Sequence, residues 1–98
     1  MEPTATNRTE PQIPKLGKDQ IYVKIYAPFK NYYDGVAKSV TAVNDTGKFD
    51  VLAEHHNFIT ILNAGEIIVR DDQGEHKIEN GIAVMHVKGN QVIVYLTI

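Results

Sequence analysis

Histidines and carboxylates are the side chains of this sequence that could hold a metal ion or move a proton. His55 and His56 are adjacent, so on an extended backbone their rings point to opposite faces and do not converge on one ion. His76 and His86 fall in separate predicted strands, and no carboxylate stands at a spacing typical of a ligand set. The sequence therefore favours surface or hydrogen-bonded histidines, and a metal site that uses His55, His76 or His86 is kept as an alternative.

Residues for nucleophilic or phosphate chemistry are missing or out of context. The chain has no cysteine, which excludes disulfides, thiolate metal sites and cysteine nucleophiles. Ser39 lies in a predicted strand rather than at a nucleophile elbow, and no Gly-rich loop opens a helix. Most carboxylates lie at predicted turns, where they are ordinary loop residues. We therefore expect no catalytic residue, no bound cofactor and no metal site.

The composition is that of an ordinary globular domain. The 98 residues carry a formal net charge of −2, with 43% hydrophobic and 22% charged residues. Because there is no basic stripe or polybasic cluster, neither nucleic acid nor an acidic membrane surface is an expected partner. Residues 1–30 hold no signal-peptide core, and the apolar run 92–96 is far shorter than the roughly 20 residues of a membrane span. We expect a cytoplasmic protein without direct membrane insertion.

The elements that must position these side chains begin after an N-terminal segment of different character. Residues 1–19 hold three of the four prolines and almost no apolar side chains, so they bury too little surface to offset the entropy of ordering. We predict a flexible tail over residues 1–19, or an arm that orders on a partner. A single β-domain over residues 20–98 follows.

From Ile21 onward, apolar and polar residues alternate with period two, which is typical of half-buried strands. Pro28 ends the first run because it cannot donate a ladder hydrogen bond. Gly89-Asn90 predicts a two-residue hairpin turn, and residues 71–74 predict a longer hairpin loop. Apolar residues do not recur at helical spacing. The sequence thus predicts an all-β fold, a flattened antiparallel β-sandwich or barrel of about 8–10 short strands.

A series of short motifs over residues 21–98 is less generic than this strand pattern. After the strand that ends at Pro28 come Tyr33, Gly35 and Val40. A turn and loop follow, with Gly47, Phe49, Val51, Leu52, His55, Phe58 and Ile59 in order. The series is completed by residues 62–67 (Leu-Asn-Ala-Gly-Glu-Ile), 80–84 (Asn-Gly-Ile-Ala-Val) and 90–92 (Asn-Gln-Val). In this order and spacing, the chain resembles the N-terminal β-sandwich of the F-type ATP synthase epsilon subunit.

This resemblance implies a non-catalytic central-stalk subunit that links gamma to the membrane c-ring and couples ion flow to ATP synthesis. It implies that Gly47, Lys48 and Phe49 face the c-ring, and that His55 and the strand through Thr60 lie toward gamma. Lys48 stands where the family usually has an acidic residue, so we expect a compensating acidic loop on the ring. The implied location is the inner face of the cell membrane, peripheral to it through the ATP synthase complex.

The sequence stops at Ile98, without the C-terminal helical hairpin that family members usually carry. From the resemblance, we expect no ATP binding and no brake on ATP hydrolysis without that hairpin. Two other interpretations stay open. One is a stand-alone β-sandwich adaptor that uses this fold in another complex, because a fold does not fix a function. The other is the small His-metal enzyme considered above.

Overall fold

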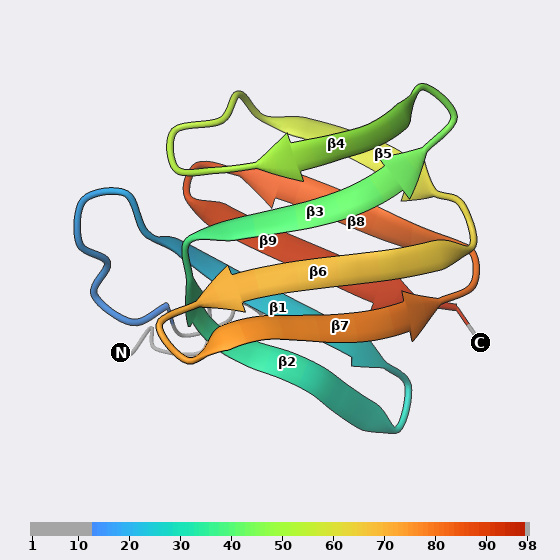
Figure 1. Ribbon diagram of the computed structural model, residues 1–98, viewed down its shortest axis with the longest axis horizontal. Helices are drawn as coiled ribbons and strands as arrows, with labels where there is room; N and C mark the ends of the chain where they lie inside the picture. Colours follow the sequence, from blue (N-terminus) through green and yellow to red (C-terminus); the bar gives the residue numbers. More distant parts are fainter. Residues whose placement is uncertain (1–12, 98) are drawn as a thin grey trace, which may run out of the picture.

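Residues 13–97 are described by the computed structural model, and over this range the chain forms nine β-strands and no helix (Figure 1). The strands are β1 (Ile21–Ala27), β2 (Lys30–Ala37), β3 (Ser39–Asn44), β4 (Gly47–Val51), β5 (Phe58–Leu62), β6 (Gly65–Asp71), β7 (Gly74–Asn80), β8 (Ala83–Lys88) and β9 (Gln91–Leu96). The predicted all-β fold is confirmed. No helix in the described part of the chain is long and apolar enough to cross a membrane.

The strands form two sheets that lie face to face as a sandwich (Figure 1). Sheet A has five strands in the order β2-β1-β9-β8-β5, and sheet B has four in the order β4-β3-β6-β7. Four hairpins, β1–β2, β3–β4, β6–β7 and β8–β9, supply most of the antiparallel pairs. The chain passes from one sheet to the other after β2, β4, β5 and β7, so the two sheets are interleaved along the sequence.

One pair of neighbouring strands in sheet A is parallel. β1 lies beside β9 in a register that places Tyr22 opposite Gln91 and Tyr26 opposite Tyr95. The Tyr22 amide also donates a 2.8 Å hydrogen bond to the carbonyl oxygen of Asn90. Hairpin signals in the sequence predict only antiparallel neighbours, so this pairing of the first and last strands could not be predicted from them.

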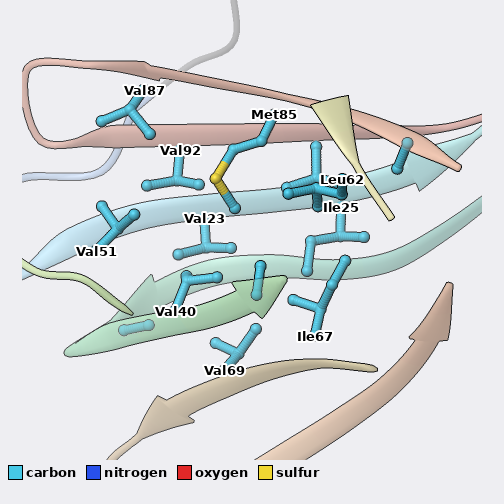
Figure 2. Packing of buried hydrophobic residues seen from close by; sticks show 14 of the residues in the cluster. Val23, Ile25, Val40, Val51, Leu62, Ile67, Val69, Met85, Val87 and Val92 are labelled. Carbon is cyan, nitrogen blue, oxygen red and sulfur yellow. The ribbon is translucent and has the colours of Figure 1, made fainter. Parts of the chain in front are cut away.

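The core lies between the two sheets. It is filled by every second side chain of the strands, the one that points toward the other sheet. In β8, Ala83, Met85 and Val87 are buried, whereas the residues between them are exposed. Figure 2 shows side chains of sheet B, such as Ile67 and Val69, packed on the same layer as those of sheet A. The buried cluster comprises Ile21, Val23, Ile25, Ala37, Val40, Ala42, Val51, Leu62, Ile67, Val69, Ala83, Met85, Val87, Val92, Val94 and Leu96. Its aliphatic, β-branched composition suits a pleated interior surface.

The turns follow the predicted chemistry with one change of length. Gly89 adopts a φ of +60° in the predicted Gly89-Asn90 turn between β8 and β9. The turn between β6 and β7 is shorter than the predicted loop, because β6 continues to Asp71 and β7 begins at Gly74. Gly74 has a φ of +120°, and the Asp71 carboxylate accepts a 2.8 Å hydrogen bond from the Gln73 amide.

The predicted boundary between tail and domain falls just before β1. Residues 1–12, most of the predicted flexible tail, lie outside the described residues. Residues 13–20 contain no strand, and β1 begins at Ile21.

A polar contact ties the two sheets together at one edge of the sandwich. The Tyr33 hydroxyl in β2 donates a 2.6 Å hydrogen bond to Asp71 Oδ2 in β6, and His76 Nε2 in β7 lies 2.9 Å from the same oxygen. The Tyr33 and His76 rings are also in contact, with centroids 5.4 Å apart. The hydrogen bond from Tyr33 lowers the pKa of Asp71, while burial and this carboxylate raise the pKa of Tyr33 above its ordinary value.

The core and the outer surface of the sandwich should respond differently to the same truncation. Ile67→Ala removes a fully buried side chain, so we expect a loss of about 2–5 kcal/mol in the free energy of unfolding. Ile59→Ala removes a side chain that is 67% exposed, so we expect a loss below about 1 kcal/mol. Urea unfolding of both variants measures the difference. Equal losses would contradict the assignment of Ile59 to the outer surface.

The contact between Tyr33 and Asp71 should make stability depend on pH. Because the pKa of Asp71 is lower in the folded state, the contact stabilises the fold above the unfolded pKa of about 3.9. This stabilisation is lost as the pH falls through the lower folded-state pKa. We therefore expect Tyr33→Phe to reduce the free energy of unfolding more at pH 7 than at about pH 2.

Urea unfolding at both pH values, with Tyr95→Phe at an exposed hydroxyl as the control, measures this difference. A reduction for Tyr33→Phe that is the same at both pH values would show that the hydrogen bond does not act through the Asp71 carboxylate.

Candidate protein-binding surfaces

The turn between β3 and β4 presents Lys48 to solvent. The Asn44 side-chain oxygen accepts hydrogen bonds from the Thr46 amide at 2.9 Å and the Thr46 hydroxyl at 2.7 Å. Gly47 then takes a φ of +113°, a conformation that side-chain-bearing residues rarely adopt. Lys48 follows on the outer face of sheet B, opposite Val43. Asn44, Thr46 and Gly47 therefore determine this turn locally, and Lys48 at its end is exposed.

Phe49 lies on the opposite side of β4 from Lys48. It is opposite the buried Ala42, and its ring packs edge-on against Phe58 with centroids 6.0 Å apart. These two rings close the edge of the sandwich between β4 and β5. Of the three residues predicted to face the c-ring, Lys48 is therefore exposed, whereas Gly47 and Phe49 are half-buried and Phe49 packs against the core.

Thr60 faces the interior side of β5. Its hydroxyl oxygen accepts a 3.1 Å hydrogen bond from the Asn44 side-chain amide of β3, so this pair joins the two sheets. The residues on either side have the opposite orientation, with Ile59 67% exposed and Ile61 61% exposed. The side chains of β5 that a partner could contact are therefore these two isoleucines.

His55 lies in the loop between β4 and β5 and stacks on His56. The two ring centroids are 4.4 Å apart, and the His55 ring also lies 5.0 Å from that of Phe58. The expectation of opposite orientations for His55 and His56 is wrong, because the backbone here is not extended and Glu54 has a φ of +66°. Even so, residues 13–97 contain no group of three or more histidine or carboxylate side chains that could hold a metal ion.

Two asparagines hold this loop against the β8–β9 hairpin. The Glu54 amide donates a 2.7 Å hydrogen bond to the side-chain oxygen of Asn90. In the reverse direction, the Gly89 amide donates a 2.8 Å hydrogen bond to the side-chain oxygen of Asn57. His55 is therefore carried on a loop that is fixed to sheet A at two points.

The two predicted contact regions lie at opposite ends of the sandwich (Figure 1). β4 runs from Gly47 to Val51, so the turn that carries Lys48 is at its beginning and the loop that carries His55 follows its end. A partner of the His55 loop and a partner of the Lys48 turn could bind at the same time.

The outer face of sheet A carries an apolar surface that the sequence analysis did not single out. Strand register aligns Ile61 of β5, Val84 of β8 and Tyr95 of β9 in one row across the sheet. The next row places Ile59 beside His86, and His86 beside Ile93. We call Ile59, Ile61, Ile82, Val84, Ile93 and Tyr95 the outer apolar face. The sequence feature that could have indicated this face is the nearly continuous apolar run of β9, because it places apolar residues on both sides of the strand.

Basic side chains border the outer apolar face. Lys24 of β1 lies beside Ile93, and Lys88 of β8 lies beside Gln91. The Tyr26 and Tyr95 rings contact each other at 5.3 Å, which extends the apolar surface toward β1. An apolar centre with a polar rim is the composition of a protein-binding surface.

The chain matches a protein-family model over nearly its whole described length. Residues 20–97 match the β-sandwich domain of the ATP synthase delta/epsilon chain. An ATP synthase epsilon chain of Sulfurimonas denitrificans is 37% identical over 76 residues, which is 76% of this chain and 58% of the relative. An epsilon chain of Trichlorobacter lovleyi is 33% identical over 54 residues, 55% of this chain and 39% of the relative. The chain thus spans 58% of the length of the first relative and 39% of the length of the second.

Solved structures share the fold at lower sequence identity. A chain in the cryo-EM structure of the central stalk and c-ring of the Tetrahymena thermophila mitochondrial ATP synthase has a TM-score of 0.67 and 15% identity. That match covers 80% of this chain and 63% of the other. A chain in the structure of the Euglena gracilis mitochondrial ATP synthase has a TM-score of 0.77 and 16% identity, over 98% of this chain and 64% of the other. On the family match over residues 20–97, the chain belongs to the ATP synthase delta/epsilon chain β-sandwich family.

Proposed function

We propose that this chain is a non-catalytic rotor subunit of an F-type ATP synthase, which links the gamma subunit to the membrane c-ring. In this function it couples ion flow to ATP synthesis by transmitting torque. The family match and the epsilon-chain names of its relatives support the proposal. The protein would be peripheral to the membrane, held at its cytoplasmic face through the ATP synthase complex.

The outer apolar face is the observation that carries this proposal. Ile59 and Ile61 are large aliphatic residues that are more than half exposed, side by side on one strand. A face of this kind is covered in a stable assembly, because its burial is favourable at roughly 25 cal/mol per Å² of apolar surface. We assign the gamma subunit as the partner that covers it, with the adjacent His55 loop in the same contact.

The different character of the two surfaces, one mainly apolar and one charged, fits two different partners. The outer apolar face would bind gamma mainly through apolar contact, whereas the Lys48 turn would bind an acidic loop of the c-ring. Between them, the close-packed core joins both surfaces in one body that transmits strain with little compliance. Torque transfer of this kind needs no catalytic group on this chain.

Charge placed on the outer apolar face should break the contact with gamma. Ile59→Asp or Ile61→Asp would bury an unpaired carboxylate, so we expect weaker binding by on the order of 100-fold. Both side chains are exposed in the free chain, so folding should be retained. Titration calorimetry with the gamma subunit of the same organism measures the affinity.

Lys77→Gln is the matched control for these substitutions, because it changes net charge by the same amount on the exposed outer face of sheet B. It should leave gamma binding unchanged. If Ile59→Asp and Ile61→Asp bind gamma as tightly as the unchanged chain, gamma does not cover this face. Recovery of a different partner that these variants release would favour the adaptor interpretation.

Reversal of the charge at Lys48 should weaken the contact with the c-ring. Lys48→Glu would replace an attraction to an acidic loop by a repulsion, so we expect roughly three- to tenfold weaker binding to purified ring, and a smaller effect at high salt. Lys77→Glu makes the same charge change on the same sheet, and we expect no effect from it. A gain in ring binding with Lys48→Glu would show that the ring presents a basic loop instead.

A further inference from the structure

The tip of the β1–β2 hairpin carries a fully exposed phenylalanine. Pro28 and Phe29 form the two-residue turn between the strands, and the exposed fraction of Phe29 is 101%. Among the exposed large apolar residues of the described chain, no other exceeds 67%. The ring therefore projects into solvent and packs on no other part of the described chain.

The turn itself does not require a phenylalanine. Tight turns favour glycine, asparagine, aspartate or serine, which either adopt positive φ or make local hydrogen bonds with the backbone. Phe29 does neither, since its φ is not among the positive values of the described residues and its side chain cannot accept a hydrogen bond. The Phe29 ring adds nothing to the packing of the described chain, so its whole apolar surface is available to another molecule.

The Phe29 turn lies at the same end of the sandwich as the Lys48 turn (Figure 1). Because β9 is parallel to β1 and antiparallel to β8, the end of β1 lies near the start of β8. β5 in turn ends where β8 begins, and the amide of Asn63 donates to the carbonyl oxygen of Val43 at the end of β3. This end therefore carries Phe29, Ile82 and the turn that leads into Lys48.

The two turns are at opposite corners of this end. Sheet A has β2 at one edge and β5 at the other, with three strands between them. Four spacings of about 4.8 Å separate these edges by roughly 19 Å. Since β4 lies over β5 through the contact of Phe49 with Phe58, the Phe29 and Lys48 turns stand about that far apart.

The charge near Phe29 matches that of Lys48. Lys30 directly follows Phe29, and its ammonium group lies 4.7 Å from the centroid of the Tyr32 ring. The tip thus combines a protruding ring with a cation that is held close to the surface by an aromatic ring. It fits a partner that offers an apolar crevice bordered by carboxylates.

We propose that Phe29 is a second anchor on the c-ring, inserted in a crevice between loops of neighbouring ring subunits while Lys48 contacts the ring at the opposite corner. A ring of identical subunits repeats the same crevice around its circumference, so equivalent binding sites for one protruding side chain occur at every subunit boundary. Contact at two corners would also resist tilting of the sandwich on the ring. This inference rests on the proposed function, because it takes the c-ring as the partner of this end.

The test is binding of the full chain to purified c-ring of the same organism, with gamma binding measured in parallel. We expect Phe29→Ser to weaken ring binding roughly 10- to 30-fold, as for loss of a buried aromatic side chain, and Phe29→Leu to retain most of the affinity. Gamma binding and the thermal midpoint should not change. Leu52→Ser, at an exposed apolar residue of the opposite end, is the control and should leave ring binding unchanged.

Two outcomes would overturn the inference. If the unchanged chain binds the ring and Phe29→Ser binds it equally well, Phe29 is not an anchor although the proposed function stands. If the unchanged chain binds ring-free vesicles of phosphatidylglycerol and phosphatidylcholine and Phe29→Ser does not, the tip contacts lipid instead of the ring. Failure of the unchanged chain to bind gamma and the ring would instead remove the proposed function itself.

Discussion

The parallel pairing of β1 with β9 is the interaction on which the rest of the structure depends. β2 joins sheet A only through β1, and β1 joins the remaining strands of that sheet only through β9. Without this pair, the β1–β2 hairpin would lose its ladder to β9, β8 and β5, and its core residues Ile21, Val23 and Ile25 would lose their place in sheet A. The pairing also orients the hairpin so that its tip lies at the same end as the Lys48 turn. A contact between the first and last strands therefore sets the geometry of both ends.

The outer faces of the two sheets differ in polarity. On sheet B, Arg70 pairs with Glu75 at 2.9 Å and donates a 2.8 Å hydrogen bond to Thr41, whose hydroxyl donates to Asp50. These groups satisfy one another and suit a surface that faces water. On the outer face of sheet A, the polar pair formed by Tyr22 and Asp34 lies toward β2, and the apolar side chains of β5, β8 and β9 lie beyond it. A sandwich with one hydrated face and one more apolar face is suited to bury the apolar face against a partner.

The sequence was sufficient to predict the elements but not the surfaces. Period-two alternation identifies strands because each inward residue must reach the core, and Gly89-Asn90 identifies a turn because both residues tolerate positive φ. The orientation of Thr60 and Ile59 depends on which face of β5 meets sheet B, and alternation of apolar residues with threonine does not decide this. The stacking of His55 on His56 depends on the backbone of Glu54, which no sequence signal indicated. The family resemblance predicts contacts at the Lys48 turn and the His55 loop, and the structure shows which side chains there are exposed and which are half-buried.

The attachment of each proposed contact residue suits the mechanical link that we propose for this chain. Ile59 and Ile61 lie on a strand, Lys48 lies at the start of one, and Phe29 lies in a two-residue turn. Among these proposed contact residues, His55 is the one on a longer loop, and Asn57 and Asn90 hold that loop against the β8–β9 hairpin. Short turns and fastened loops leave few soft dihedral angles between the core and the contact points. A force applied at the outer apolar face therefore reaches the opposite corners of the turn end through packed side chains and strand ladders.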